Sequence, residues 1–329
     1  MSAESAIVAP RLDEVERAAR ELRGVVLETP LVPLRGREDE DVWLKLEVLQ
    51  PVGSFKIRGV YHAARARLRE LGPRELVTVS AGNTARALAY SARLLGVRAR
   101  SLVPDTAPET KVQAIRRLGG IPELVTREEL FAYLSERRFE REPVAFVHPW
   151  TDRDLLVGHG TLGLEIHRQL AGLETVFVPV GGGGLLGGVA STLRALDPSI
   201  RIVAVEPEGC PSFHEARRTG APVQVPCSTM CDGVAVPFVT EALFSLLSAL
   251  TDDCVLVSEA EVRSAIRELA LENGVVAEGA GALSLAAALR TPRNERGRSV
   301  ALVTGSNIDA ALLAAILGES TASGRSSPA

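Results

Sequence analysis

The chain has 329 residues, a formal net charge of −4, 46% hydrophobic residues and 24% charged residues. Its length exceeds a typical domain of roughly 100–200 residues, so two domains or one large domain are expected. The hydrophobic and charged fractions are those of an ordinary globular protein, which excludes disorder along the whole chain. The weakly acidic charge gives no basic footprint for nucleic acid, and we find no signal peptide or membrane-spanning run, so we expect a cytoplasmic protein.

Strand and helix patterns alternate along most of the chain. Residues 11–23 show the helical spacing of a surface helix, 42–48 predict a strand, and 54–70 predict a helix with Ser54 as a candidate N-cap. Further β-rich stretches lie at 76–80, 97–104, 121–125, 144–148, 175–180, 200–206 and 299–305, and further helical patterns at 83–95, 109–118, 127–137 and 186–196. This alternation predicts parallel sheets covered by helices on both faces.

Lysine is rare: of 37 basic residues, only Lys45, Lys56 and Lys111 are lysines. Arginine replaces lysine wherever only positive charge is needed, but it cannot supply a primary amine. The remaining lysines are therefore enriched for positions that need an amine, although chance survival stays open for Lys45 and Lys111.

A glycine-rich turn joins an apolar strand to a helix within residues 175–196. Glycines let backbone N–H groups approach an anion closely, and the helix N-terminus adds a favourable dipole, so a phosphate is the expected ligand. Gly182, Gly184 and Gly187 fit a G-x-G-x-x-G dinucleotide motif, with Glu206 in the place of the ribose-binding acid. Alternatively, the four consecutive glycines hold one isolated phosphate, as in pyridoxal phosphate. A ligand-free tight turn is the third reading, and the heavy entropic cost of four glycines argues against it.

The segment KLEVLQPVGSFKIRGV (45–60) decides between the two cofactors. It places Lys56 at the start of a helix, where the helix dipole, Arg58 and the apolar Phe55 are each expected to lower the pKa of its amine. The segment resembles the active-site lysine segment of fold-type II pyridoxal-phosphate enzymes, in the serine/threonine dehydratase and serine racemase branch. That resemblance implies an α/β fold of the tryptophan synthase β type.

Further segments resemble that family in the same order: SAGNTARALA (80–89), the Gly181–Gly184 turn, CDGVAV (231–236), AEGAGA (277–282) and VTGSNID (303–309). The resemblance implies pyridoxal 5'-phosphate as cofactor and Lys56 as the catalytic residue. The implied cofactor-binding residues are Lys56, Phe55, Asn83, Gly181, Gly182, Gly183, Gly184, Gly233, Glu278 and Thr304. The implied substrate-binding residues are Ser80, Ala81, Gly82, Asn83 and Thr84.

Three departures from the family pattern bear on the reaction. Thr84 stands where the dehydratases usually have histidine, and it resembles the β-replacement synthases that make cysteine. Ala81 stands where eukaryotic-type serine racemases carry a second serine, so efficient racemisation is not expected. Glu206 matches the first ligand of the family's divalent-cation site, but the acid six positions later is Ser212 here, and we assign no metal ligands.

The cysteines and histidines add no further motif. Cys210, Cys227, Cys231 and Cys254 do not look like a disulfide framework, and we expect Cys227 and Cys231 to be small buried residues. None of the five histidines shows zinc-ligand spacing with a cysteine.

The sequence thus predicts a large domain of residues 1–71 and 149–318, a small inserted domain of residues 72–148, and a disordered tail at 319–329. The expected reaction is elimination of water from L-threonine or L-serine, which gives a 2-keto acid and ammonia. A β-replacement synthase that uses serine or O-acetylserine is the first alternative, and an NAD-binding oxidoreductase is the second. The expected partner besides the amino acid is a second copy of the chain, in a homodimer.

Overall fold

The structure is a computed structural model and describes residues 6–37 and 40–319. The strands are β1 (Leu31–Pro33), β2 (Val42–Leu46), β3 (Leu76–Val79), β4 (Ala99–Pro104), β5 (Ile121–Val125), β6 (Ala145–Phe146), β7 (Thr175–Pro179), β8 (Arg201–Pro207), β9 (Asp253–Val257) and β10 (Ser299–Val303). The α-helices are α1 (Leu12–Glu21), α2 (Lys56–Leu71), α3 (Asn83–Leu95), α4 (Glu109–Arg117), α5 (Arg127–Ser135), α6 (Arg153–Gln169), α7 (Gly184–Leu196), α8 (Ser212–Thr219), α9 (Glu241–Leu250), α10 (Glu259–Leu271), α11 (Gly279–Arg290), α12 (Arg293–Arg296) and α13 (Ala310–Gly318).

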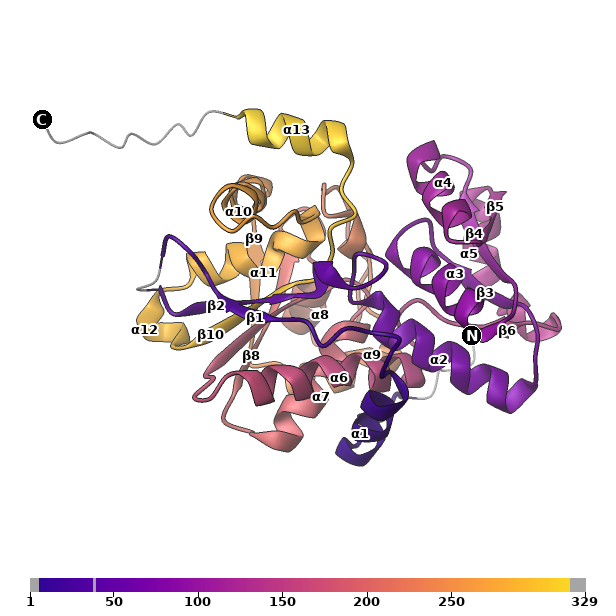
Figure 1. Cartoon of the computed structure of the whole chain (residues 1–329), viewed down its shortest axis with the longest axis horizontal. Helices are drawn as coiled ribbons and strands as arrows, with labels where there is room; N and C mark the ends of the chain where they lie inside the picture. The colour runs from indigo at the N-terminus through magenta and orange to yellow at the C-terminus, as the bar shows by residue number, and fades with distance from the viewer. Residues whose placement is uncertain (1–5, 38–39, 320–329) are drawn as a thin grey trace, which may run out of the picture.

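The strands form two sheets (Figure 1). The larger sheet has the order β1-β2-β10-β7-β8-β9, and the smaller has the order β5-β4-β3-β6. All neighbouring strands are parallel except β1, which runs antiparallel to β2. The expected α/β class with mostly parallel sheets is confirmed.

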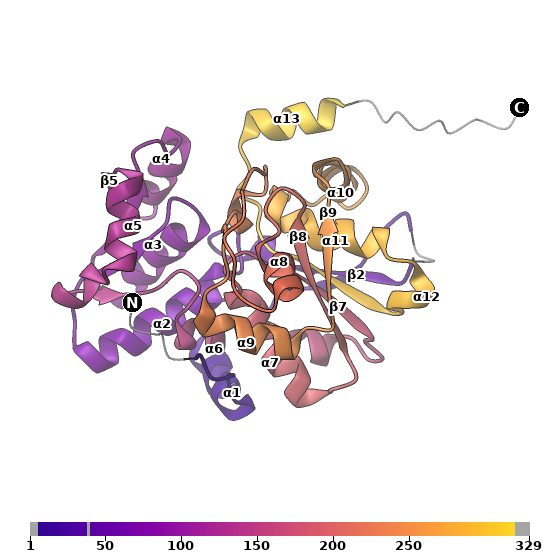
Figure 2. The ribbon, with the colours of Figure 1, turned by 180° about the vertical axis from the view of Figure 1, so that it is seen from behind.

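Helices cover both faces of the larger sheet, as Figures 1 and 2 show, with α6 and α7 on one side and α10 and α11 on the other. Successive side chains of β7 therefore pack on opposite faces of the sheet. Val176 and Val178 lie in the core with α6 and α7, whereas Phe177 lies in the core with α10 and α11. Successive side chains of a strand point to opposite faces, so a strand buried on both sides is apolar throughout. The sequence TVFVP of β7 meets that requirement, and all five of its residues are buried.

Helix α2 connects the two sheets. It packs against α6 beside the larger sheet and against α3 beside the smaller one. Its approach to α6 depends on two glycines, because a Cβ on Gly59 would overlap the ring of His159 and a Cβ on Gly158 would lie 2.5 Å from the carbonyl oxygen of Arg58. The close contact fixes the position of Lys56 at the first turn of α2.

The structure corrects three local expectations. Ser54 does not cap α2: the N-cap residue is Phe55, and Ser54 Oγ is buried without a hydrogen-bond partner in the described part of the chain. Cys210 and Cys227 form a disulfide with a Cα–Cα distance of 4.4 Å, and Cys227 is exposed rather than buried. The disulfide joins the residues just before α8 to the loop that follows α8. No short sequence motif marks this pairing.

Two further expectations concern the ends of the chain and the membrane. Of the tail predicted to be disordered, residues 320–329 lie outside the described residues. Among the helices that the structure describes, none combines the length and apolar character needed to cross a membrane.

Candidate active site

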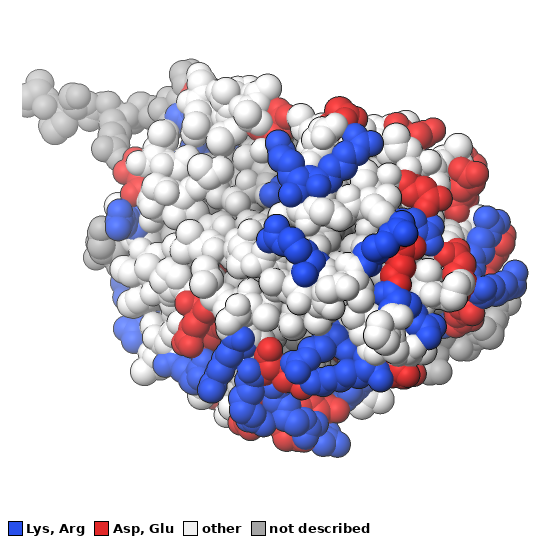
Figure 3. All heavy atoms as spheres, turned by 45° about the vertical axis from the view of Figure 1, so that its right-hand side comes forward, with Lys and Arg blue, Asp and Glu red and all other residues white. Residues whose placement is uncertain are grey.

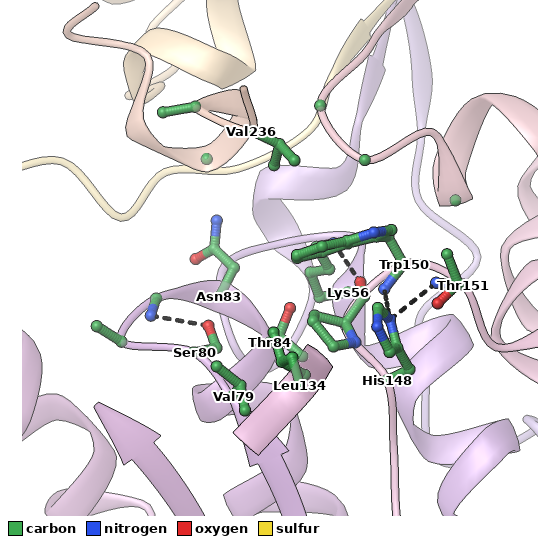
Figure 4. Close-up of a pocket in the computed structure, with 18 of the residues that line it drawn as sticks. Lys56, Val79, Ser80, Asn83, Thr84, Leu134, His148, Trp150, Thr151 and Val236 are labelled. Atoms are coloured by element: carbon green, nitrogen blue, oxygen red, sulfur yellow. Dashed lines mark hydrogen bonds between the residues drawn. The ribbon is translucent and has the colours of Figure 1, made fainter. Parts of the chain in front are cut away.

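One cavity lies at the carboxyl ends of the parallel strands of both sheets. Chain segments that leave β3, β6, β7 and β10 turn into it, which is the usual place for a ligand in open α/β folds. Every site residue predicted from the sequence lines this cavity: Phe55, Lys56, Ser80, Ala81, Gly82, Asn83, Thr84, Gly181, Gly182, Gly183, Gly184, Gly233, Glu278 and Thr304. Figure 4 shows Lys56, Asn83 and Thr84 pointing into the same space from α2 and α3.

Lys56 begins α2 and faces the cavity. The preceding residue is tied to the end of β10, because the Phe55 N–H donates to the carbonyl oxygen of Thr304 at 3.0 Å. Burial lowers the pKa of Lys56 to about 8, with Glu278 acting weakly in the opposite direction. A substantial fraction of this amine is therefore neutral near pH 8, as a nucleophile or base requires.

Arg58 does not lower the pKa of Lys56 as expected, because its guanidinium points into the protein. Arg58 is fully buried and donates to Glu47 Oε2 at 2.7 Å and to Glu165 Oε1 at 2.6 Å. Lys45, also fully buried, donates to Glu165 Oε2 at 2.6 Å. Two cations and two carboxylates thus form a neutral buried network directly beneath the Lys56 turn.

The glycine turn follows β7 and leads into α7. The N-cap of α7 is Gly183 with φ +90°, a conformation that favours glycine. The turn has no room for side chains. A Cβ on Gly182 would overlap Trp150, and a Cβ on Gly181 would lie 2.9 Å from Val234 Cα. The N–H groups of the first turn of α7 have no acceptors within the helix, so the turn can accept an anion.

A second helix N-terminus faces the same cavity at residues 80–84. Ser80 follows β3, its Oγ accepts a hydrogen bond from the N–H of Gly82 at 3.1 Å, and Asn83 begins α3. Free N–H groups of this first turn, together with the Thr84 hydroxyl, suit a carboxylate.

Glu278 lies between the two sheets and contacts residues from three segments. Its Oε1 accepts a hydrogen bond from Asn83 Nδ2 at 2.7 Å, and its N–H donates to the carbonyl oxygen of Gly305 at 2.9 Å. A Cβ on Gly233 would lie 3.4 Å from the same Oε1. Burial and Asp232 raise the pKa of Glu278 to about 7, so the carboxyl group is partly protonated near neutral pH.

Thr304, at the end of β10, supplies a neutral hydroxyl on the cavity wall. The side chain is buried, and its Oγ1 donates to the carbonyl oxygen of Ala280 at 3.3 Å.

Several cavity residues were not predicted from the sequence. His148 and Trp150 follow β6, and Leu134 and Val236 lie on opposite sides of the space in Figure 4. His148 Nδ1 accepts from the N–H groups of Trp150 and Thr151 at 3.3 and 3.1 Å, and burial lowers its pKa to about 3, so its ring stays neutral. The position of both residues just beyond a predicted strand was the available signal, since such positions meet at one edge of a sheet.

Glu206 does not play the role that a dinucleotide site needs. Its side chain is fully buried and accepts hydrogen bonds from the N–H groups of Phe213 and His214, both at 2.8 Å, at the start of α8. A carboxylate engaged in this way is not available to a ribose, and this overturns the oxidoreductase alternative. Within residues 6–37 and 40–319, no group of three or more His, Cys, Asp and Glu side chains is arranged to hold a metal ion.

Comparison with known proteins agrees with this geometry. Residues 22–305 match the family described as "Pyridoxal-phosphate dependent enzyme". The chain belongs to this family of pyridoxal-phosphate dependent enzymes. The resemblance noted from the Lys56 segment is thereby confirmed.

This pyridoxal-phosphate dependent enzyme is similar to several named proteins of the family. An L-threonine ammonia-lyase of Thermotoga maritima is 36% identical over 314 residues, which are 93% of this chain and 78% of that protein. The catabolic L-threonine dehydratase TdcB of Staphylococcus aureus is 35% identical over 312 residues, which are 91% of this chain and 89% of that protein. Among solved structures, maize serine racemase matches with a TM-score of 0.87 and 29% identity, covering 94% of this chain and 97% of that chain.

The cavity of this pyridoxal-phosphate dependent enzyme fits the cofactor. The Gly181–Gly184 turn packs so closely on Trp150, Val234 and Leu247 that it accepts no side chains, and its bare backbone leads into the N-terminus of α7, which suits a phosphate. Lys56 offers an amine to an aldehyde. Asn83 and Thr304 offer further polar groups on the wall of the same cavity.

Proposed function

We propose that this enzyme is an ammonia-lyase that converts L-threonine or L-serine into a 2-keto acid and ammonia. The observation that carries the proposal is the amine of Lys56, with its pKa lowered to about 8, in one cavity with a phosphate-sized glycine turn and a second helix N-terminus. Threonine ammonia-lyases and dehydratases are among the relatives with 35–38% identity, which supports the same reaction here.

Bound pyridoxal phosphate supplies an electron-withdrawing ring that stabilises negative charge at the substrate Cα. The residues that would hold it are Lys56, Phe55, Asn83, Gly181, Gly182, Gly183, Gly184, Gly233, Glu278 and Thr304. Thr304 would offer the pyridine nitrogen only a neutral hydroxyl, which would not keep that nitrogen protonated as an aspartate would. Thr304 would thereby favour reactions in which a β-substituent leaves the substrate.

The remaining residues bind the substrate and move its protons. The substrate carboxylate lies at the N-terminus of α3. There it accepts hydrogen bonds from N–H and hydroxyl groups of the substrate-binding residues Ser80, Ala81, Gly82, Asn83 and Thr84. Lys56 Nζ takes the proton from the substrate Cα as general base. The β-hydroxyl takes up a proton and leaves as water, so the proton lost from Cα and the hydroxyl group together account for the one water released. Hydrolysis of the released enamine consumes one water and gives the keto acid and ammonia.

β-Replacement is the second candidate, and Thr84 is the observation in its favour. Thr84 lines the cavity at the first turn of α3, where a small hydroxyl side chain leaves more room than histidine for an added nucleophile. Elimination is preferred because the Lys56, CDGVAV and closing segments all resemble the dehydratases, and the named relatives are ammonia-lyases.

A direct experiment separates these outcomes. The purified enzyme is expected to be yellow, to lose its colour with borohydride, and to keep a covalent label on Lys56. L-Threonine, L-serine, hydroxyaspartate and phenylserine are then assayed for keto acid and ammonia, and L-serine and O-acetylserine are also assayed with added sulfide. A colourless, label-free protein contradicts the cofactor assignment, and β-substituted alanine as the main product establishes replacement.

Stereochemistry gives an independent check on Ala81. A racemase needs a base on the face of the substrate opposite Lys56, and the methyl group of Ala81 cannot serve. Keto acid formation is therefore expected to exceed appearance of the D-enantiomer greatly, as chiral chromatography of the remaining amino acid will measure. Rapid D-serine formation contradicts this role for position 81.

We also propose that residues 72–148 form a small domain inserted into a large one, and that the enzyme is a cytoplasmic homodimer. The smaller sheet lies within 72–148, which supports the domain division. Helix α13 supports a partner chain: its sequence AALLAAILG is apolar, yet Ile316 is its one buried residue in the described chain. Light scattering of the purified enzyme tests the dimer, and cell fractionation tests the location.

A further inference from the structure

The disulfide between Cys210 and Cys227 joins two segments of different character. Cys210 is buried and follows β8, a strand in the interior of the larger sheet. Cys227 is exposed and lies in the segment 220–240 between α8 and α9. The structure describes all of that segment, and it is loop apart from one 3-10 turn at Asp232–Val234. The bridge therefore ties a segment with little regular structure to the end of a sheet strand.

The tied segment is one wall of the active-site cavity. Its residues 222–224 and 232–240 line the cavity, and Figure 4 shows Val236 on the side opposite Thr84. The bridge lies directly behind this wall, because Cys210 Sγ is 3.5 Å from the carbonyl oxygen of Val236. A change at the bridge is thus one residue away from the space proposed for the substrate.

Backbone contacts on both sides of Cys227 hold the crossing of the two segments. The Ser228 N–H donates to the carbonyl oxygen of Gly209 at 2.8 Å, and a Cβ on Gly209 would overlap the carbonyl oxygen of Ser228. The Val225 N–H donates to the carbonyl oxygen of Pro237 at 2.9 Å, and Pro237 lines the cavity. The position of the cavity wall therefore depends on the crossing that the bridge closes.

A purely structural staple is the alternative role for this bridge. Staples are typical of small domains with small cores, whereas the described part of this chain has two large apolar cores, neither of which includes Cys210 or Cys227. The other two cysteines, Cys231 and Cys254, are free thiols. Burial raises the pKa of Cys231 to about 12, so this thiol stays protonated and does not attack the bridge. A single exposed disulfide beside free thiols is typical of a labile, redox-sensitive pair.

We propose that Cys210 and Cys227 are a redox-modification site, at which a dithiol reductant opens the bridge, releases the cavity wall and lowers the activity of the enzyme. One thiolate of the dithiol attacks Sγ of the exposed Cys227, the S–S bond breaks, and Cys210 leaves as a thiolate. The second thiol then attacks the mixed disulfide, which releases Cys227 and closes the dithiol into its own disulfide. Two electrons pass from the dithiol to the bridge, and its two protons end on the two cysteines. The reverse exchange with an oxidised dithiol restores the bridge.

A redox titration of the native holoenzyme tests the site itself. The probe is dithiothreitol at set ratios of its reduced and oxidised forms. This dithiol is uncharged, whereas an anionic thiol would collect at the basic side chains that are prominent on the side of the molecule carrying α2 to α5 (Figure 3). Thiols are alkylated in denaturant and located by peptide mass spectrometry. Cys210 and Cys227 are expected to titrate together and reversibly in the folded enzyme, while Cys231 and Cys254 are alkylated at every ratio.

Two further measurements test the effect on the wall. Peptides that cover residues 221–240 are expected to exchange amide hydrogens about 10-fold faster in the reduced enzyme, because the released loop opens more often, while peptides of β4 are unchanged. The value of kcat/KM for L-threonine is expected to fall about 5- to 30-fold on reduction and to recover on reoxidation. The kinetic measurement rests on the proposed ammonia-lyase function, and the hydrogen exchange does not.

Variants separate the bridge from other actions of the reductant. Cys227→Ser removes the exposed half of the bridge, and Cys210→Ala removes the buried half. Both are expected to show the kcat/KM of the reduced enzyme at every dithiol ratio. Cys254→Ala is the matched control, since Cys254 is a free thiol outside the cavity lining, and it keeps the wild-type response. If Cys210→Ala does not fold, Cys227→Ser carries the test alone, because its residue is exposed.

Four results overturn the inference. Four alkylated thiols at every ratio mean that no bridge forms, and a bridge that opens only when the chain unfolds is a structural staple. A wild-type response of Cys227→Ser means that the dithiol acts elsewhere. Equal hydrogen exchange of residues 221–240 in the two states means that the bridge does not control the wall. Failure of the wild type to deaminate threonine and serine contradicts the proposed function instead, and the titration and the hydrogen exchange still decide the redox site.

Discussion

The side-chain amide of Asn83 donates a 2.7 Å hydrogen bond to Oε1 of Glu278, although 195 residues separate the two in the sequence. Asn83 starts α3 beside the smaller sheet, and Glu278 is the N-cap residue of α11 beside the larger one. The bond therefore links cavity-lining residues from the helices beside the two sheets. It also counteracts the effect of burial on the pKa of Glu278, because an N–H donor stabilises the ionised carboxylate.

Replacement of Asn83 by alanine removes this bond and a polar contact proposed for the cofactor. Cofactor affinity is expected to fall about 10- to 100-fold, the cost of leaving a buried polar group unpaired. Titration of the apoenzyme with pyridoxal phosphate, followed by absorbance, measures it. Asn294→Ala on α12 is the control, since Asn294 is exposed and is not among the residues that line the cavity. An affinity within twofold of wild type contradicts the role given to Asn83.

The buried charge network beneath Lys56 gives a stability prediction. Glu47 accepts from Arg58 at 2.7 Å and from Thr29 Oγ1 at 2.6 Å, and it is fully buried. Glu47→Gln leaves two buried cations with one carboxylate, so the free energy of unfolding is expected to fall by about 3–5 kcal/mol. Chemical denaturation of the apoenzyme measures this loss.

An exposed ion pair supplies the comparison. Asp13 pairs with Arg11 at 2.8 Å on the surface of α1, and both side chains are exposed. Asp13→Asn is expected to leave the denaturation midpoint unchanged, because solvent screens such pairs. Equal effects of the Asp13 and Glu47 substitutions would show that the buried network does not stabilise the Lys56 turn.

The glycine turn is sensitive to a single methyl group. A Cβ on Gly182 would overlap the Trp150 ring, whereas a Cβ on Gly318 meets nothing within 4 Å. Gly182→Ala is expected to destabilise the enzyme by about 1–3 kcal/mol, as overpacking does, and to weaken phosphate binding. Gly318→Ala is the matched control with no loss. Thermal unfolding with and without inorganic phosphate distinguishes overpacking from loss of the anion site, since only the latter removes the stabilisation by phosphate.

How much the sequence could predict depends on how local each signal is. The glycine turn, the Lys56 segment and the start of α3 are continuous motifs, and the structure places all three along the cavity lining. Their roles toward cofactor and substrate, which the family resemblance implied, stay predictions. Leu134 is a single side chain that the packing of distant elements brings to the cavity, so no pattern marked it. Trp150 follows a predicted strand and Val236 ends the CDGVAV segment, but neither was recognised as a site residue. The packing of distant elements also hid the Lys45–Glu165 pair, whose members are 120 residues apart. The Cys210–Cys227 bond spans only 17 residues, and no motif within that stretch marked it.

His159 is a fully buried histidine whose ring nitrogens have no hydrogen-bond partner in the described chain. Its ring lies 4.8 Å from that of Phe55. Burial, with the nearby charges of Lys56 and Arg58, lowers its pKa well below 6.5. The unfolded chain therefore binds a proton near pH 6.5 that the folded enzyme does not bind.

Acid should consequently weaken the fold through this residue. Below pH 6.5 the unfolded state holds more protons, so the free energy of unfolding falls by up to about 1.4 kcal/mol per pH unit from His159. Glu206 and Glu278 act in the opposite direction because burial raises their pKa values to about 7, and the variant must therefore be compared with wild type at each pH. His159→Gln, which cannot be protonated, is expected to lose less stability than wild type between pH 7 and pH 5. Parallel denaturation curves for the two proteins across that range would exclude His159 as the source of acid sensitivity, and His148→Gln would then be tested, since the pKa of His148 is also lowered, to about 3.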